Sequence, residues 1–174
     1  QEVGVTPLQL AMAFSAVANG GVLYQPRLIR ASREDGAWRN WASFRSRRVI
    51  SEETAGEMRR IFSGAVEYGT GLSAAVDGVT VAGKTGTAER LLFGSGVYLS
   101  AFAGMIPAER PGLVAVVVVD RPGFAYRYGS TLSATAFSRM MSGILSCEPG
   151  LAMSGTPRMA SGMLAQADSG TGSL

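Results

Sequence analysis

Residues 113–119 form an unbroken apolar run that consists mostly of valine. A strand with one wet face alternates apolar and polar residues, whereas an unbroken β-branched run is typical of a strand covered on both faces. We therefore expect a central strand, over residues 113–120, in a sheet that has helices on both sides. No apolar run in the chain approaches the roughly 18 residues that a membrane span needs. The 174 residues suffice for one folding unit with a substantial core.

Two further strands are predicted before this run, over residues 79–88 and 98–106. The connection that follows residue 106 contains Pro107, Pro111 and Gly112, which predict a turn. A turn this short joins antiparallel neighbours. An imperfect alternation over residues 25–31 predicts one more short strand, and the stretch after it, up to Arg48, has no clear period.

Three helices complete the predicted fold. The first should begin after Thr6, an N-cap followed by proline, and end at the Gly20-Gly21 pair. Ser51 should cap the second helix, and a closing helix is expected over residues 130–146. Residues spaced to face the core are Leu10, Phe14 and Val17 in the first helix, Met58, Ile61, Phe62, Ala65 and Val66 in the second, and Phe137, Met140, Met141, Ile144 and Leu145 in the third.

The order helix, strand, helix, three strands, helix predicts an α+β fold in which helices flank an antiparallel sheet. After residue 148 the composition changes to small and polar residues with almost no periodicity, which predicts a flexible tail over residues 149–174. Because the chain opens at Gln1 without an initiator methionine, we also expect it to be a piece of a longer protein.

The residues that are missing exclude several kinds of chemistry. The chain has no histidine, so its own residues cannot build a Ser-His-Asp triad or an HExxH metal site. Cys147 is the only cysteine, which excludes an internal disulfide, and we expect it to be a small buried residue. We expect no metal and no cofactor. The net charge is +3, but the basic residues are scattered along the sequence, so we expect no nucleic-acid partner.

The only lysine, Lys84, begins the sequence Lys84-Thr85-Gly86-Thr87 within a predicted strand. Because every other basic residue is arginine, this position indicates a need for a compact, rotatable ammonium group, although a solvated lysine is the alternative. In a strand, Thr85 and Thr87 share one face and Lys84 lies on the other. Gly86 has no Cβ, so a ligand can approach the backbone closely there.

This arrangement suits a substrate that has a carboxylate and lies along the strand. The hydroxyl and ammonium groups would bind the carboxylate. If the strand lies at the edge of the sheet, its unpaired N–H groups could bind an extended peptide as an added strand. One of these N–H groups could also stabilise an oxyanion.

Four sequence blocks together are more specific than this tetrapeptide alone. In chain order they are residues 4–11 with Ala18-Asn19-Gly20-Gly21, residues 81–88, residues 102–107 with 116–120, and the stretch from Tyr128-Gly129 to Phe137. In this order they resemble the class B penicillin-binding proteins, which are peptidoglycan D,D-transpeptidases. The resemblance covers most of residues 3–146 and implies the penicillin-binding protein transpeptidase and β-lactamase-like fold, of which this chain would be the C-terminal part.

The resemblance implies that peptidoglycan stem peptides are cross-linked by serine acyl transfer at D-Ala-D-Ala, a reaction that β-lactams inhibit. A serine activated by its neighbouring lysine would attack the penultimate D-Ala carbonyl. The residues that the resemblance makes catalytic here are Lys84 and Thr87, the latter through its N–H in the oxyanion hole. The substrate-binding residues would be Thr85, Gly86, Thr87 and Tyr128. Tyr128 would belong to an aromatic wall, or else would only cap the end of the sheet.

Two motifs of the family are absent from the chain. Ser-x-x-Lys would require serine at position 81, which is Val81, and neither Asn19 nor Asn40 has serine two residues earlier, as Ser-x-Asn requires. Thr135 stands where family members usually have proline. We therefore expect residues 1–148 to be the C-terminal part of a transpeptidase domain that lacks its nucleophile and is inactive alone.

The resemblance also implies partners and a location. The expected partners are peptidoglycan stem peptides, β-lactam antibiotics, and cell-wall synthases with their division or elongation partners. The expected location is the cell envelope, at the periplasmic or extracytoplasmic face of the bacterial inner membrane. Contact with the membrane would occur only through an N-terminal anchor outside this chain.

Two other functions remain open at this point. A β-lactam sensor or a serine β-lactamase would share Lys-Thr-Gly but should lack the block Thr6-Pro7-Leu8-Gln9-Leu10. A noncatalytic envelope module could bind stem peptides or division partners through the same sheet. The upstream sequence would separate this module from an enzyme, because an enzyme needs Ser-x-x-Lys there.

Overall fold

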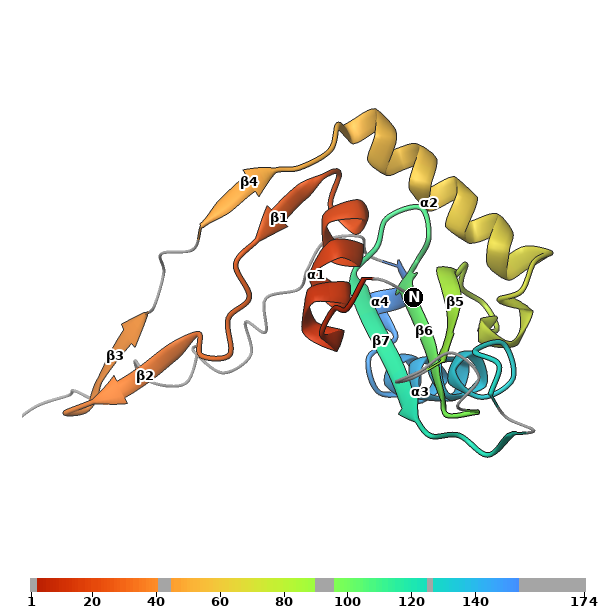
Figure 1. Cartoon of the computed structure of the whole chain (residues 1–174). Coiled ribbons are helices and arrows are strands. Elements are labelled where there is room, and N and C mark those ends of the chain that lie inside the picture. Colours follow the sequence, from red (N-terminus) through yellow and green to blue (C-terminus); the bar gives the residue numbers. More distant parts are fainter. Residues whose placement is uncertain (1–2, 41–44, 90–95, 125–126, 154–174) are drawn as a thin grey trace, which may run out of the picture.

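A three-stranded antiparallel sheet forms the centre of the molecule (Figure 1). The computed structural model describes residues 3–40, 45–89, 96–124 and 127–153. The strands β5 (Ala82–Glu89), β6 (Tyr98–Ile106) and β7 (Leu113–Asp120) lie in the order β5-β6-β7. The last two strands have the bounds that the sequence predicts. β5 begins later than predicted, because Val79 takes part in a short bridge with Val76 before the strand starts.

Helices cover the apolar run of β7 on both faces of the sheet, as predicted, but its side chains are only partly buried and Val118 is exposed. Val114 and Val116 pack on one face with α1 (Pro7–Ala18) and α2 (Glu52–Glu67). Leu113, Ala115 and Val117 pack on the other face with α3 (Ser133–Cys147). The predicted central position is wrong, because β7 is an edge strand of the sheet within the described residues. Cover from helices on both faces of the sheet accounts for the absence of polar alternation.

The first two helices begin at the predicted caps. Thr6 and Gln9 form a reciprocal capping box, in which the Gln9 N–H donates to Thr6 Oγ1 and the Thr6 N–H donates to Gln9 Oε1. Ser51 Oγ accepts from the Thr54 N–H at 3.0 Å. Phe14 of α1 stacks on Phe62 of α2, with ring centroids 5.0 Å apart, and this pair joins the two helices above the sheet.

Two residues predicted to face the core are exposed, and so is the cysteine. Ile61 is 56% exposed, because α2 turns Ala55, Gly64 and Val66 inward instead. Met140 of α3 is 40% exposed, while Phe137 and Met141 beside it fill the core. Cys147 is also exposed, contrary to the prediction, because it is the last residue of α3 and lies beyond the buried stripe. The closing helix itself begins at Ser133, three residues later than predicted.

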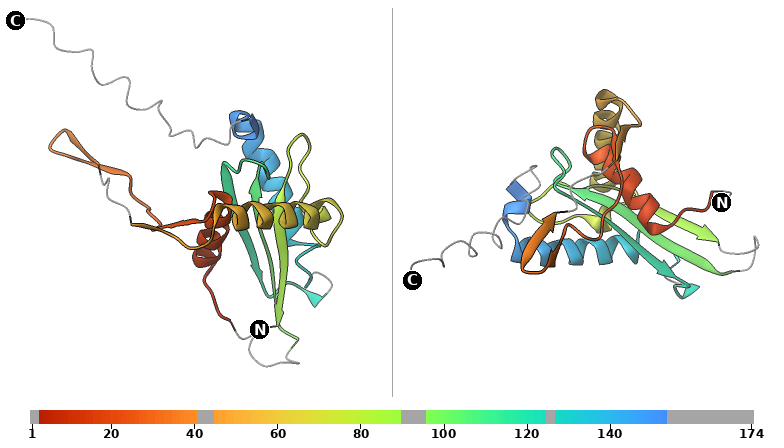
Figure 2. Two further views of the ribbon diagram at one scale, coloured as in Figure 1. Left: turned by 90° about the horizontal axis from the view of Figure 1, so that it is seen from above. Right: turned by 90° about the vertical axis from the view of Figure 1, so that its left-hand side faces the viewer.

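Residues 22–40 and 45–48 form an arm that projects away from the sheet and its helices (Figures 1 and 2). Strand β1 (Val22–Tyr24) pairs with β4 (Ser46–Arg48), and β2 (Ala31–Glu34) pairs with β3 (Ala37–Asn40). The strand predicted over residues 25–31 is therefore wrong, since most of that stretch connects β1 to β2. It contains Pro26, which has no N–H to donate, and Leu28, which is fully exposed and has no core to pack on.

Past α3, the short helix α4 (Gly150–Met153) occupies the start of the predicted tail. The rest of that tail, residues 154–174, lies outside the described residues, so the flexible tail stays a prediction. Among the described residues, none of the helices has the length and hydropathy required to span a bilayer.

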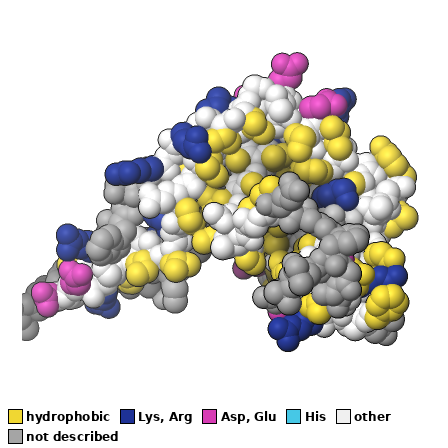
Figure 3. Space-filling view, in the orientation of Figure 1, with side chains coloured by type: hydrophobic (Ala, Val, Ile, Leu, Met, Phe, Trp, Pro, Cys, Tyr) yellow, Lys and Arg dark blue, Asp and Glu magenta, His cyan; other side chains and the backbone are white. Residues whose placement is uncertain are grey.

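Several apolar side chains have no cover in the chain by itself. Val3, Val5 and Leu8 are exposed around the start of α1, and Figure 3 shows hydrophobic side chains gathered below α2. Exposed apolar patches of this kind are typical of surfaces that another segment or protein covers.

We expect the chain expressed alone to bind a hydrophobic dye such as anilinonaphthalene sulfonate. The control is the longer protein of which we expect the chain to be a piece, and it should bind less dye if its remaining part covers apolar surface. Fluorescence titration at equal molar concentration measures the difference. A monomeric chain that melts cooperatively and binds no dye would contradict this prediction.

Candidate active site

The first residues of strand β5 are buried, whereas the lysine that follows them is exposed. Val81, Ala82 and Gly83 are buried beside α2, whereas Lys84 is exposed. Within the described residues β5 is an edge strand that pairs only with β6. The edge position predicted for a peptide-binding strand is therefore present, and its accessible part begins at Lys84.

Pairing with β6 assigns the motif side chains to the two faces of the sheet. Thr85 lies opposite Phe102 and Thr87 opposite Ser100, on the face that α3 covers. Lys84 lies opposite Ala103, on the face of α1 and α2. The predicted division between the two threonines and the lysine is thus present in the strand.

The Lys84 ammonium turns back around the edge of the strand. Its Nζ donates to the Thr85 carbonyl oxygen at 3.1 Å and to Thr85 Oγ1 at 3.2 Å. Thr85 Oγ1 also shares a hydrogen bond of 3.0 Å with Thr70 Oγ1. In the part of the chain that is described, no carboxylate pairs with Lys84. Its positive charge is therefore available to an anion that approaches this edge.

The Thr87 hydroxyl has a main-chain partner on the loop that precedes α3. The Gly129 N–H donates to Thr87 Oγ1 at 3.2 Å. A hydroxyl has one proton and two lone pairs, so Thr87 still has its proton to donate. Thr87 is exposed and can direct that proton to a ligand.

Gly86 stands between the two threonines and borders open space. A Cβ added there would meet only the Ala101 Cβ, at 3.6 Å, and the Ala101 carbonyl oxygen, at 4.0 Å. By contrast, a Cβ on Gly83 would lie 2.4 Å from the Phe102 ring. Packing within the described residues therefore requires glycine at position 83 but not at position 86. Close approach of a ligand is a reason for glycine at position 86, and it stays a prediction.

Tyr128 belongs to a stack of aromatic and cationic side chains. The Arg127 guanidinium lies 3.9 Å from the Phe124 ring centroid and 4.3 Å from that of Tyr128. Arg127 also donates to the Tyr128 hydroxyl at 2.8 Å. Tyr128 is 50% exposed and directly precedes Gly129, so the stack adjoins the loop that contacts Thr87.

Sequence reasoning did not find Thr70 or Gly129 as contacts of the motif threonines. Both lie far from the motif along the chain, and single threonine and glycine residues carry no local pattern that marks such contacts. The Tyr128-Gly129 pair was visible only as part of a longer block.

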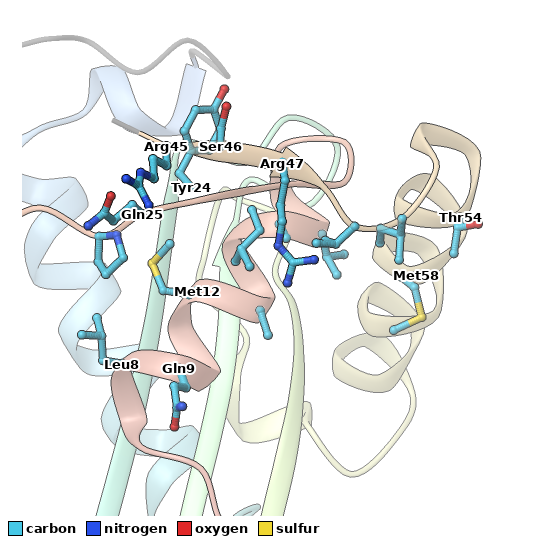
Figure 4. Close-up of a pocket in the computed structure, with 17 residues that line it drawn as sticks. Leu8, Gln9, Met12, Tyr24, Gln25, Arg45, Ser46, Arg47, Thr54 and Met58 are labelled. Carbon is cyan, nitrogen blue, oxygen red and sulfur yellow. The ribbon is translucent and has the colours of Figure 1, made fainter. Parts of the chain in front are cut away.

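A large apolar groove lies away from this strand (Figure 4). It has a volume of about 1400 Å³ and is bounded by α1, the strands β1 and β4, and the start of α2. Met12 of α1 and Met58 of α2 line it, with Arg47 of β4 between the two helices. Its lining includes no lysine and no carboxylate, so its side chains do not supply the ammonium that the sequence predicts for the site. We therefore place the candidate active site on β5.

The described residues include no group of three or more cysteine, aspartate or glutamate side chains that could hold a metal ion. The candidate site on β5 instead consists of one ammonium group, two hydroxyl groups and main-chain edge groups. Such a set binds anions by charge and hydrogen bonding.

Comparison with known proteins identifies the family. The family described as "Penicillin binding protein transpeptidase domain" matches residues 1–142. This chain belongs to that family. The match covers α1, the arm, all three strands of the central sheet and most of α3. The resemblance to class B penicillin-binding proteins and the α+β fold are thereby confirmed, and β-lactamases and noncatalytic modules are not favoured.

Individual members of the penicillin-binding protein family are similar over most of the chain. Stage V sporulation protein D of Bacillus subtilis is 35% identical over 147 residues, which cover 81% of this chain and 23% of that protein. The crystal structure of the D,D-transpeptidase domain of a peptidoglycan glycosyltransferase from Eggerthella lenta has 35% identity and a TM-score of 0.69, and it covers 84% of this chain and 33% of that one.

Penicillin-binding protein 3 of Mycobacterium tuberculosis, solved in complex with aztreonam, has 30% identity and a TM-score of 0.75. The match covers 86% of this chain and 36% of that one. The chain thus spans about a quarter of the curated relative and about a third of each solved structure.

Proposed function

We propose that residues 1–148 are the C-terminal part of the catalytic domain of a peptidoglycan D,D-transpeptidase. The observation that carries this proposal is the exposed stretch of β5, where two hydroxyl groups and an ammonium that pairs with no carboxylate of the described residues lie at the open edge of a sheet. Family membership and the aztreonam bound to a similar penicillin-binding protein support it.

In the proposed reaction, a serine upstream of this chain attacks the penultimate D-Ala carbonyl of a stem peptide. The peptide bond breaks, the terminal D-Ala leaves with a proton on its amine, and an acyl-enzyme ester remains. An amine of a neighbouring stem peptide then attacks the ester, which forms the cross-link and returns the proton to serine. A β-lactam resembles D-Ala-D-Ala and leaves the serine acylated.

In this proposal, Lys84 attracts the substrate carboxylate and acts on the proton path beside the nucleophile, while the hydroxyl groups of Thr85 and Thr87 bind that carboxylate. The Thr85 carbonyl accepts from Lys84 at the open edge of the strand. Because alternate residues of a strand direct their main-chain groups to the same edge, we expect the Thr87 N–H to face outward as well. That N–H would be half of the oxyanion hole.

The proposal also gives roles to Gly86 and Tyr128, which the surroundings of the strand support. Gly86 leaves room for the substrate backbone, since the space beside it is open. Tyr128 is half-exposed and directly precedes Gly129, which contacts Thr87. In this proposal its ring forms part of an aromatic wall beside the substrate.

The proposed function includes a location and partners. The full-length protein would act in the cell envelope, on the periplasmic or extracytoplasmic side of the inner membrane. Its partners would be cell-wall synthases and division or elongation proteins, and its ligands would be stem peptides and β-lactams.

The test uses the full-length protein with a fluorescent penicillin and with a stem peptide that ends in D-Ala-D-Ala. We expect one penicillin per protein molecule and release of D-Ala from the peptide. A folded protein that does neither would contradict the proposed function.

Deletion of residues 151–174 should leave acylation of the full-length protein intact. Among the described residues, the last core contacts come from Ile144 and Leu145, and the deleted residues are mostly small or polar. Stopped-flow acylation rates of the parent and the deletion variant measure the effect. A folded deletion variant that is no longer acylated would show that the predicted tail has a role in the site.

A further inference from the structure

The loop between Tyr128 and α3 approaches the motif strand unusually closely. Gly129 is buried, and a Cβ built on it would lie 2.5 Å from the Ala101 carbonyl oxygen and 2.6 Å from the Gly86 carbonyl oxygen. Real Cβ atoms do not approach main-chain atoms this closely. Only glycine therefore fits at this position while its N–H contacts Thr87 Oγ1.

A second contact holds the same loop to the sheet. Ser133 Oγ and Ser100 Oγ share a hydrogen bond of 2.7 Å, and both residues are fully buried. Ser100 lies directly opposite Thr87 in the pairing of β5 with β6. A buried hydroxyl without a partner is destabilising, so this pair favours one position of the loop over Thr87.

Gly129 also connects the loop to the closing helix. The Ala134 N–H donates to the Gly129 carbonyl oxygen at 2.9 Å, and the Thr131 N–H donates to the Tyr128 carbonyl oxygen at 3.1 Å. The peptide unit that contains the Gly129 N–H is therefore held at its Tyr128 carbonyl by the turn that leads into α3, and at its N–H by Thr87 of the sheet.

We propose that Gly129 is a positioning residue that makes the Thr87 hydroxyl a hydrogen-bond donor toward the substrate. The Gly129 N–H occupies one lone pair of Thr87 Oγ1, and the hydroxyl proton is then directed away from the loop toward the open side of the strand. A donor held in this way prefers an ionised carboxylate to an ester. The inference rests on the proposed function for the role of Thr87 in substrate binding.

The test compares acylation of the full-length protein by benzylpenicillin and by its methyl ester. We expect the parent to react faster with the acid, and we expect Gly129→Ala to lower this preference by about tenfold, as expected for loss of a hydrogen bond to a charged group. Thr87→Val should lower it similarly, and Thr87→Ser should restore it. The double variant, Gly129→Ala with Thr87→Val, should lose no more of the preference for the acid than either single variant.

Gly143→Ala is the matched control. Gly143 lies in α3, the helix that follows the Gly129 loop, and a Cβ there would meet nothing within 4 Å. The Gly143→Ala variant should react with benzylpenicillin and with its methyl ester at the parental rates. If Gly129→Ala lowers the two rates equally, or if the two single effects add in the double variant, the positioning role is wrong and the loop acts only through stability.

Amide hydrogen exchange supplies a readout that needs no acylation. In Thr87→Val the Gly129 N–H loses its acceptor, so the peptide containing Gly129 should exchange faster than in the parent. Unchanged exchange would overturn the inference. If neither penicillin reacts with the parent, the proposed function fails, and the exchange result still decides whether Thr87 holds the Gly129 amide.

Discussion

Replacing Lys84 with alanine in the full-length protein should slow acylation by a β-lactam on the order of a hundredfold or more. Losses of this size are typical when one electrostatic group of an active site is removed. Lys84 is exposed, pairs with no carboxylate among the described residues, and donates hydrogen bonds to its neighbour Thr85. Its positive charge can therefore act on a bound substrate and on the proton transfer beside the nucleophile.

Lys84→Arg should recover part of the rate. The charge remains, but the planar guanidinium group fits a site for a compact ammonium less well. Arg60→Ala is a control for loss of a surface cation, since Arg60 lies on α2 and pairs with Glu57 there. All three variants should melt like the parent, because neither side chain is part of the core. A folded Lys84→Ala protein that is acylated at the parental rate would show that β5 is not the active-site edge.

This chain expressed alone should form no covalent adduct with penicillin. Ser-x-x-Lys requires serine at position 81, where the chain has Val81, and the structure buries that valine in the core between the sheet and α3. No rearrangement of the strand would therefore provide a nucleophile at this position. Intact mass spectrometry after incubation with excess penicillin measures the adduct.

The full-length protein is the control for this experiment, and it should gain the mass of one penicillin. A stable adduct of one penicillin per isolated chain would place the nucleophile within residues 1–174 and would contradict the proposed division of the active site. A small, substoichiometric mass gain would indicate nonspecific acylation of surface groups instead.

The central sheet could be predicted because its signals are local. β6 and β7 have the predicted bounds. The prolines and the glycine between them mark the end of β6 and the start of β7. The opposite faces of Lys84 and Thr85 follow directly from the two-residue period of a strand. The helix caps at Thr6 and Ser51 likewise depend on residues within one turn of each other.

Features that depend on distant segments could not be predicted in the same way. The edge position of β7 depends on which strands lie beside it, and the exposure of Ile61 and Met140 depends on how each helix is rotated against the sheet. The contact between Gly129 and Thr87 joins residues that are far apart in sequence, and no periodic pattern encodes it.

A crystal structure of the full-length protein acylated by benzylpenicillin is the most direct test of the assignment of β5 as the active-site edge. We predict that the penicillin carboxylate lies within about 3.2 Å of Thr85 or Thr87 Oγ1, and that the acyl carbonyl oxygen faces the Thr87 N–H. The Lys84 ammonium should lie beside them. An adduct whose carboxylate contacts other groups, such as Arg45 and Arg47 of the apolar groove, with β5 unoccupied, would contradict the account.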